Sequence, residues 1–147
     1  VPLGDRRCYI LLSLIHPHHA LYQNQFHRDH LHPRARFEEM YQYGLTPEQQ
    51  VKWWDSRDRL PNIQLLQGDA NNHKRAKPLK NWLESEYPEQ VSRNVFLEQN
   101  DIPLELDLDF KNFENFFDTR KERLRTRLKK ALNIKNEEAA LASAVSI

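Results

Sequence analysis

Two stretches of the sequence, FHRDHLHP at 26–33 and PNIQLLQGDANNHK at 61–74, decide the fold of this chain. The first lies in a segment that has aromatic residues, partial polar–apolar alternation and neither Gly nor Pro before Pro33, which favours a strand near 23–31. The second contains a short apolar run at 62–66, and the turn that ends this run is followed by an aspartate suited to cap a helix. The sequence therefore predicts two strands and then a helix.

Further helices are predicted on either side of these strands. Residues 6–15 carry apolar side chains at helical spacing, and the TPEQ motif at 46–49 has the order of a capping box and predicts a helix over 47–58. A stripe of Phe and Leu residues three and four positions apart predicts a long amphipathic helix over 111–133. The segment 86–109 has no pattern that assigns it to a helix or a strand.

The length of the chain, 147 residues, is typical of one domain, and we expect a single α+β domain over 1–147 with its core motif at 20–83. The chain opens with Val1, and its one methionine is Met40, so we expect it to be the C-terminal part of a longer protein with an N-terminal domain upstream. The tail, 134–147, has no pattern that requires an ordered structure.

Composition and charge exclude several classes of protein. Lys and Arg number 22 against 21 Asp and Glu, so the chain has no overall field of the kind that attracts nucleic acid or membranes, and any basic surface must be local. The longest apolar run, 9–15, is much shorter than the roughly 20 residues of a membrane-spanning helix. The one cysteine, Cys8, excludes an internal disulfide and a zinc site built on several cysteines. We therefore expect a cytoplasmic protein.

Histidine is clustered in this sequence. Six of the seven histidines lie between His16 and His32, and only His73 stands apart. Imidazole is a good zinc ligand, so the cluster suggests a structural zinc site, although a cysteine pair to complete it is missing. The alternative interpretation is a group of polar surface histidines.

A different interpretation starts from Asp29 and His30 at the end of the first predicted strand. Hydrolysis of a phosphodiester needs a base that activates water and a hard cation held by oxygen ligands. His30 would supply the base, and Asp29 and Asn71 would supply oxygens. Adjacent strand residues point to opposite faces, so Asp29 and His30 address one site only where the strand ends.

These residues resemble a known family, the HNH endonucleases of the His-Me finger (ββα-metal) class. The matching elements are H-x-D-H-x-x-P at 27–33, N-[IL]-x-L-L at 62–66 and an asparagine nine residues after Asn62. The form of the motif is similar in particular to the C-terminal nuclease domain of GmrSD-type restriction and phage-defence proteins. The resemblance implies a ββα-metal unit surrounded by additional α-helices, and a metal-dependent DNA endonuclease that acts in restriction or phage defence.

Carried over residue by residue, the resemblance implies a role for each position of the motif. His30 would be the general base, and Asn62 would brace the loop that orients the catalytic site. Asp29 and Asn71 would hold one Mg²⁺ or Mn²⁺ ion.

Local charge indicates where DNA would bind. No acidic residue lies between 70 and 83, and the resemblance places Lys74 against the phosphate backbone, with Arg75 and Lys77 adding to the basic surface. The basic run at 120–130 is either a DNA contact or the solvated face of the last helix. Three histidines are further candidates to line the site: His27, His32 and His73.

Two alternative functions stay open at the level of sequence. The first is a nucleic-acid-binding module that has the same fold and does not cleave. The second is a histidine-rich metal-binding interaction domain, for which the nine-residue spacing between Asn62 and Asn71 would be a coincidence.

Overall fold

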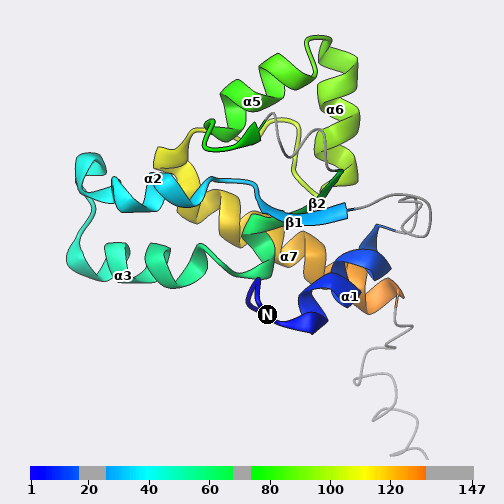
Figure 1. The fold of residues 1–147 in the computed structure, drawn as a ribbon, viewed down its shortest axis with the longest axis horizontal. Helices are drawn as coiled ribbons and strands as arrows, with labels where there is room; N and C mark the ends of the chain where they lie inside the picture. Colours follow the sequence, from blue (N-terminus) through cyan, green and yellow to red (C-terminus); the bar gives the residue numbers. More distant parts are fainter. Residues whose placement is uncertain (17–25, 68–73, 132–147) are drawn as a thin grey trace, which may run out of the picture.

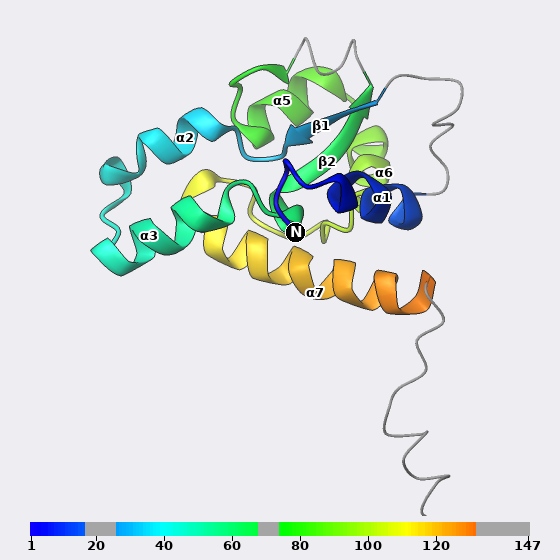
Figure 2. The same ribbon diagram turned by 60° about the horizontal axis from the view of Figure 1, so that its bottom comes forward.

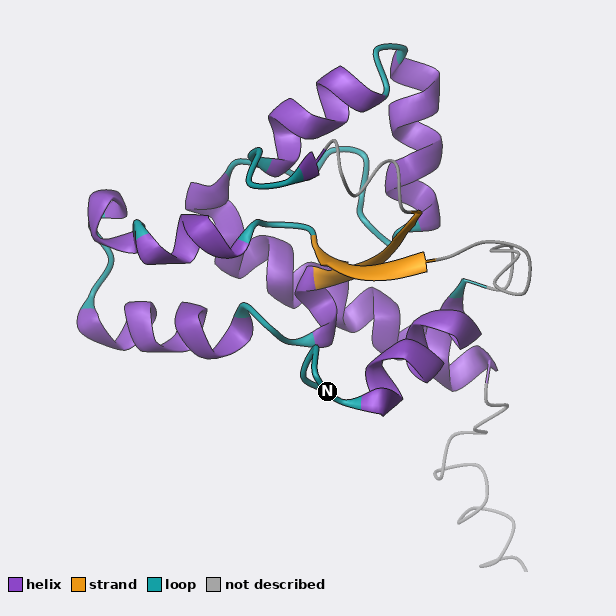
Figure 3. Cartoon of the chain, in the orientation of Figure 1, coloured by secondary structure: helices purple, strands orange, loops and turns teal. Residues whose placement is uncertain are grey.

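A computed structural model describes residues 1–16, 26–67 and 74–131 of the chain. Within these ranges, helices surround one two-stranded antiparallel sheet, which confirms the α+β class (Figures 1 and 3). The elements, in chain order, are α1 (Arg6–Ile15), β1 (Phe26–His30), α2 (Arg34–Glu38), η1 (Met40–Tyr43), α3 (Pro47–Ser56), η2 (Leu60–Asn62), β2 (Ile63–Gln67), α5 (Leu79–Glu86), α6 (Gln90–Gln99), η3 (Phe110–Asn112) and α7 (Phe113–Ala131), where η denotes a 3-10 turn.

Local capping explains where two of the predicted helices begin. Helix α1 follows Asp5, whose carboxylate accepts a hydrogen bond from the backbone nitrogen of Arg7 at 2.9 Å. Helix α3 follows a complete capping box, in which Thr46 Oγ1 accepts from the Gln49 nitrogen at 3.2 Å and Gln49 Oε1 accepts from the Thr46 nitrogen at 2.9 Å. Both helices therefore begin where the sequence predicts, and α3 ends at Ser56.

The two predicted strands pair antiparallel, and the segment 31–62, which contains α2 and α3, connects them. This strand pair is called the hairpin below. Strand β1 pairs with β2 in a register that sets Asp29 opposite Gln64 and His30 opposite Ile63. The chain turns directly after His30, where the Leu31 nitrogen donates to the Asn62 carbonyl at 2.8 Å. The predicted start of the first strand, at 23–25, and most of the helix predicted after the second strand lie outside the described residues.

Helix α7 runs along the hairpin and spans much of the length of the molecule (Figure 2). It lies inside the range predicted for it, and its Phe and Leu stripe is buried as far as Leu124, with Leu128 partly buried. None of the helices in the described ranges, α7 included, combines the length and the apolar character that a bilayer crossing requires.

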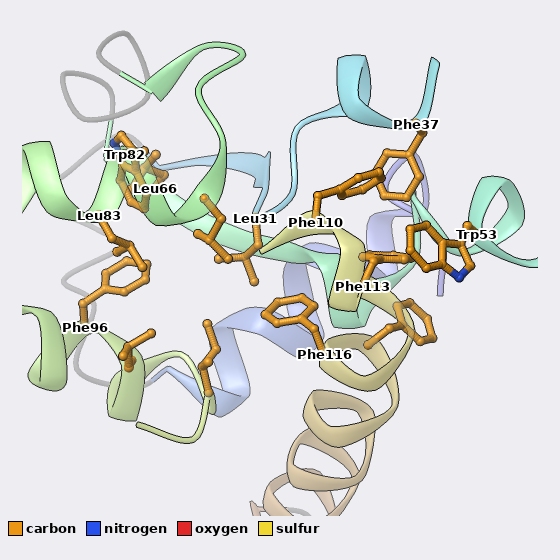
Figure 4. Close-up of a cluster of buried hydrophobic side chains, with 14 of the residues drawn as sticks. Leu31, Phe37, Trp53, Leu66, Trp82, Leu83, Phe96, Phe110, Phe113 and Phe116 are labelled. Atoms are coloured by element: carbon orange, nitrogen blue, oxygen red, sulfur yellow. The ribbon is translucent and has the colours of Figure 1, made fainter. Parts of the chain in front are cut away.

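Two apolar clusters cover the two faces of strand β2. Leu66 belongs to a large cluster rich in aromatic rings, in which Phe37, Trp53, Phe110, Phe113 and Phe116 gather at one end and Trp82, Leu83 and Phe96 at the other (Figure 4). Ile63 and Leu65 belong to a smaller cluster with side chains of α1 and with Leu124 of α7. Because side chains alternate along a strand, β2 is buried on both faces.

Helix α6 lies in the segment that the sequence did not assign. Glu89, the residue before the helix, makes no side-chain capping hydrogen bond, and Val91 and Val95 are exposed. Its buried residues, Phe96 and Leu97, lie in its last turns and pack into the large cluster. This helix is therefore defined by tertiary packing rather than by a local signal.

Arg120 of α7 is completely buried and ties the helix to the start of β2. Its guanidinium donates to the carbonyls of Pro61 at 2.7 Å, Ile63 at 2.9 Å and Leu60 at 3.3 Å, and to that of Asn100 at 2.8 Å. Burial lowers the pKa of the guanidinium to about 10, and the charge of Asp101 opposes that shift. Arg120 therefore remains charged at neutral pH, and its hydrogen bonds to these carbonyls are charge-assisted.

We expect Arg120→Leu to lower the free energy of unfolding by about 3 kcal/mol, because several buried carbonyls lose their donor at once. Urea denaturation measures this change. Arg123→Leu, an exposed arginine on the same helix, is the matched control and should change the free energy by less than about 0.5 kcal/mol. Equal effects of the two substitutions would contradict the structural role of Arg120.

Candidate active site

The residues that carry the sequence motif gather at the end of β1 that faces η2. Asp29 and His30 are the last two residues of β1, and Asn62 directly precedes β2. His30 and Ile63 form the final pair of the ladder, so Asn62 lies beside the turn that follows His30. Asp29, His30 and Asn62 therefore lie together at one end of the strand pair.

One oxygen of Asp29 is bound by the protein. Asp29 Oδ2 is 3.0 Å from Lys74 Nζ and accepts a hydrogen bond from Gln64 Nε2 at 3.1 Å. The other oxygen, Oδ1, has no hydrogen bond to any described residue. Among the described residues, the carboxylate is therefore held in place through Oδ2.

Lys74 is buried, with none of its side chain exposed. Besides its ion pair with Asp29, its ammonium donates to the backbone carbonyl of His30. Burial lowers the pKa of this ammonium, and the charge of Asp29 opposes the shift. Lys74 was predicted to contact DNA phosphate, and in the structure it contacts the two motif residues. The two other basic residues predicted to bind DNA, Arg75 and Lys77, are exposed.

His30 contacts a residue that the sequence did not single out. Its Nε2 lies 2.8 Å from Oδ1 of Asp58, which follows α3, and Nδ1 has no hydrogen bond to a described residue. Asp58 lies in the charged run SRDRL at 56–60, which in sequence is typical of a solvated helix end. A separation of 28 positions gave no local signal for the pair.

Asp29 and His30 contact different side chains, although both stand at the end of β1, where the chain turns. No hydrogen bond or ion pair joins the carboxylate of Asp29 to the ring of His30, and both residues are described. Lys74 connects them, because it contacts the carboxylate of one and the backbone carbonyl of the other. The structure thus places Gln64 and Lys74 around Asp29, and Asp58 beside His30.

Asn62 holds the segments that follow His30 and precede Asp58. Its buried amide accepts from the His32 nitrogen at 2.9 Å and donates to the carbonyls of His32 at 3.1 Å and Arg57 at 2.8 Å. One side chain therefore fixes the turn after His30 relative to the residue before Asp58.

We expect Asn62→Ala to lower the free energy of unfolding by about 2–3 kcal/mol, because buried backbone groups lose their partners. Chemical denaturation followed by tryptophan fluorescence measures the loss. Asn81→Ala, an exposed asparagine on α5, is the control and should have almost no effect. If Asn62→Ala were as stable as this control, Asn62 would not brace the loop.

His32 lies in the core. Its ring packs against Phe116, Phe113 and Phe110, with centroids 4.5, 5.6 and 5.7 Å apart. Burial lowers the pKa of His32 to about 3, and the charge of Lys74 adds to the shift. The ring is therefore neutral in the folded protein at neutral pH.

This burial predicts an acid-sensitive fold. The folded state resists protonation of His32, whereas the unfolded chain takes up a proton as the pH falls below 6.5, so acid favours unfolding until about pH 3. His32 should contribute a fall of about 1.4 kcal/mol per pH unit within this window. Urea titrations between pH 6 and pH 4 should show a shallower fall for His32→Phe than for the wild type. His27→Gln, which changes an exposed histidine, should keep the wild-type slope.

The remaining histidines are not gathered around one centre in the described part of the chain. His16 is buried at the end of α1, His27 is exposed on β1, and His73 lies outside the described residues. Within the described ranges, no three His, Cys, Asp or Glu residues are close enough together to hold a metal ion.

Two side-chain oxygen atoms in this region have no hydrogen bond to a described residue. Asp29 Oδ1 has no partner among the described residues, and Gln64 Oε1 is buried without a hydrogen bond there. The amide of Gln64 already contacts the Asp29 carboxylate through its nitrogen. Carboxylate and amide oxygens are ligands of the type that Mg²⁺ takes, whereas the ammonium of Lys74, 3.0 Å from the same carboxylate, opposes a second positive charge there. Asn71, the second predicted ligand, lies outside the described residues.

Gln64 was missed by sequence reasoning, although a signal for it existed. It is a polar residue inside the apolar run NIQLL, and it is completely buried. A buried polar side chain needs a partner, and the register gives it Asp29 on the neighbouring strand.

The basic run of α7 divides into two groups. Arg120 is buried, and Arg127 is 3.1 Å from Asp101 and donates to the carbonyl of Ile15. Lys121 and Arg125 are exposed and line a groove between α3 and α7 whose floor includes Leu60 and other apolar residues. Neither Asp29 nor His30 lines this groove.

Comparisons with known proteins assign no function to this site. No family model matches the chain, and no curated protein matches it. The functional interpretation therefore depends on the motif residues and their geometry.

Proposed function

We propose that the chain is a divalent-metal-dependent DNA endonuclease of the HNH type, with His30 as its general base. The observation that carries this proposal is that the buried side chain of Asn62 holds the turn after the Asp29-His30 pair through hydrogen bonds to the backbone of His32. The resemblance assigns this bracing role to the asparagine at this position of the motif. A ββα-metal unit, with the hairpin as its two strands, is part of the same proposal.

His30 is suited to the role of base by its two ring nitrogens. Nε2 is engaged by Asp58, and Nδ1 has no hydrogen bond to a described residue, so an unprotonated Nδ1 can accept a proton from water. The water oxygen then forms a bond to phosphorus, and the bond from phosphorus to the leaving 3′-oxygen breaks with its electron pair on that oxygen.

Asp29 Oδ1, with Asn71 as the resemblance implies, would hold one Mg²⁺ or Mn²⁺ ion. Such an ion supplies charge neutralisation at the phosphate and at the leaving oxygen. Lys74 and Gln64 hold the carboxylate of Asp29 in a fixed position through its other oxygen.

Arg75 and Lys77 are the residues we propose to contact the DNA backbone. Both are exposed, and they follow directly on Lys74, which contacts Asp29. Backbone contacts of this kind give affinity without sequence recognition. We therefore assign the choice of target to an upstream domain of a longer protein, in a cytoplasmic restriction or phage-defence system.

The proposal predicts that the purified chain nicks supercoiled plasmid in Mg²⁺ or Mn²⁺ and not in EDTA. His30→Ala should lower the rate by about 10²–10⁴-fold, which is the usual contribution of general base catalysis. Gel assays of nicked and linear plasmid measure this rate. Gln42→Ala, an exposed substitution on η1, should cleave at the wild-type rate.

Cleavage by His30→Ala at the wild-type rate would contradict the role of His30. A folded wild-type chain that binds DNA and does not cut it in either metal would instead support a binding module. Tightly bound zinc that survives dialysis would support a histidine-based metal site.

A further inference from the structure

The contact between His30 and Asp58 determines which nitrogen of the ring carries the proton. Nε2 and Oδ1 are 2.8 Å apart, and an ionised carboxylate only accepts hydrogen bonds. The proton of the neutral ring therefore lies on Nε2, and Nδ1 keeps its lone pair. Only 15% of the His30 side chain and 29% of the Asp58 side chain are exposed, so water competes little for this contact.

Asp58 is itself fixed by its neighbours. Arg57 Nε lies 3.3 Å from Asp58 Oδ2, and the Arg57 guanidinium stacks 3.8 Å from the centre of the Trp54 ring. The carbonyl of Asp58 accepts from the Leu3 nitrogen at 2.6 Å. One carboxylate oxygen thus faces an arginine and the other faces the histidine, so the carboxylate has little freedom to rotate.

Asn62 fixes the same pair through the backbone. It binds the carbonyl of Arg57, the residue before Asp58, and both backbone groups of His32, two residues after His30. The separation between the His30 ring and the Asp58 carboxylate is therefore set by a buried amide and does not depend on the pair alone.

We propose that Asp58 is a positioning residue for the reaction, which fixes the proton of His30 on Nε2 and leaves Nδ1 as the atom that takes the proton of the attacking water. This inference rests on the proposed nuclease function. When Nδ1 takes that proton, the ring becomes an imidazolium whose positive charge lies beside the Asp58 carboxylate. That Coulomb attraction is absent from the ground state and favours the transfer.

The test uses the full chain labelled with ¹⁵N-histidine, together with Asp58→Ala, Asp58→Asn and the control Asp55→Asn. Asp55 is exposed near the end of α3 and contacts neither motif residue. Subtraction of the spectrum of His30→Gln assigns the ring signals of His30. At a pH where the ring is neutral, the wild type should show a protonated, slowly exchanging Nε2 and an unprotonated Nδ1.

In Asp58→Ala the Nε2 proton should exchange rapidly with water, and both nitrogen shifts should move toward those of free imidazole. Asp58→Asn tests the charge, because it keeps the size of the side chain and an oxygen acceptor. Both variants should lower plasmid cleavage by about 10–100-fold at saturating DNA, with unchanged DNA affinity. Asp55→Asn should match the wild type in the spectrum and in cleavage.

A wild-type ring with its proton on Nδ1, or a Nε2 signal that is unchanged in Asp58→Ala, would overturn the inference. Wild-type cleavage rates in both Asp58 variants would also overturn it. If the wild type cleaves no DNA in any metal, the nuclease proposal fails, and the spectra still decide whether Asp58 fixes the ring. Circular dichroism of each variant separates these outcomes from a loss of fold.

Discussion

The rest of the site depends on one buried amide, that of Asn62. It donates two hydrogen bonds and accepts one, and its partners are His32, two residues after the candidate base, and Arg57, the residue before Asp58. Arg120 fixes the adjacent backbone from the other direction, because its guanidinium binds the carbonyls of Pro61 and Ile63. Two buried polar side chains, those of Asn62 and Arg120, thus fix the short stretch 60–63, which leads into β2.

Asp29 and His30 have different partners at the end of β1. Asp29 faces Gln64 and Lys74, whereas His30 faces Asp58. Side chains alternate along a strand, which gives the two adjacent residues different partners. Both residues stand at the last positions of β1, where the chain turns. Lys74 connects them, because its ammonium contacts the carboxylate of Asp29 and the backbone carbonyl of His30.

Local signals in the sequence predicted most of the elements and only part of the site. The capping box at 46–49 and the Phe and Leu stripe of α7 depend on neighbouring residues, so α3 and α7 could be predicted. The contacts of Asp58 and Lys74 join residues 28 and 45 positions apart, which no local pattern specifies. The burial of Arg120 could not be predicted either, because in sequence Arg120 belongs to a basic run typical of a solvated face.

The charges of Asp29 and Lys74 explain how a partly buried carboxylate and a fully buried ammonium are accommodated in the folded chain. A partly buried carboxylate without a partner is costly, and a fully buried ammonium is more so. Lys74 and Asp29 offset each other's cost at 3.0 Å, and this pairing uses only one of the two carboxylate oxygens. Gln64 donates to that same oxygen and leaves its own buried oxygen without a partner in the described structure. The carboxylate of Asp29 is thus fixed by the fold through Oδ2 alone among its contacts with described residues.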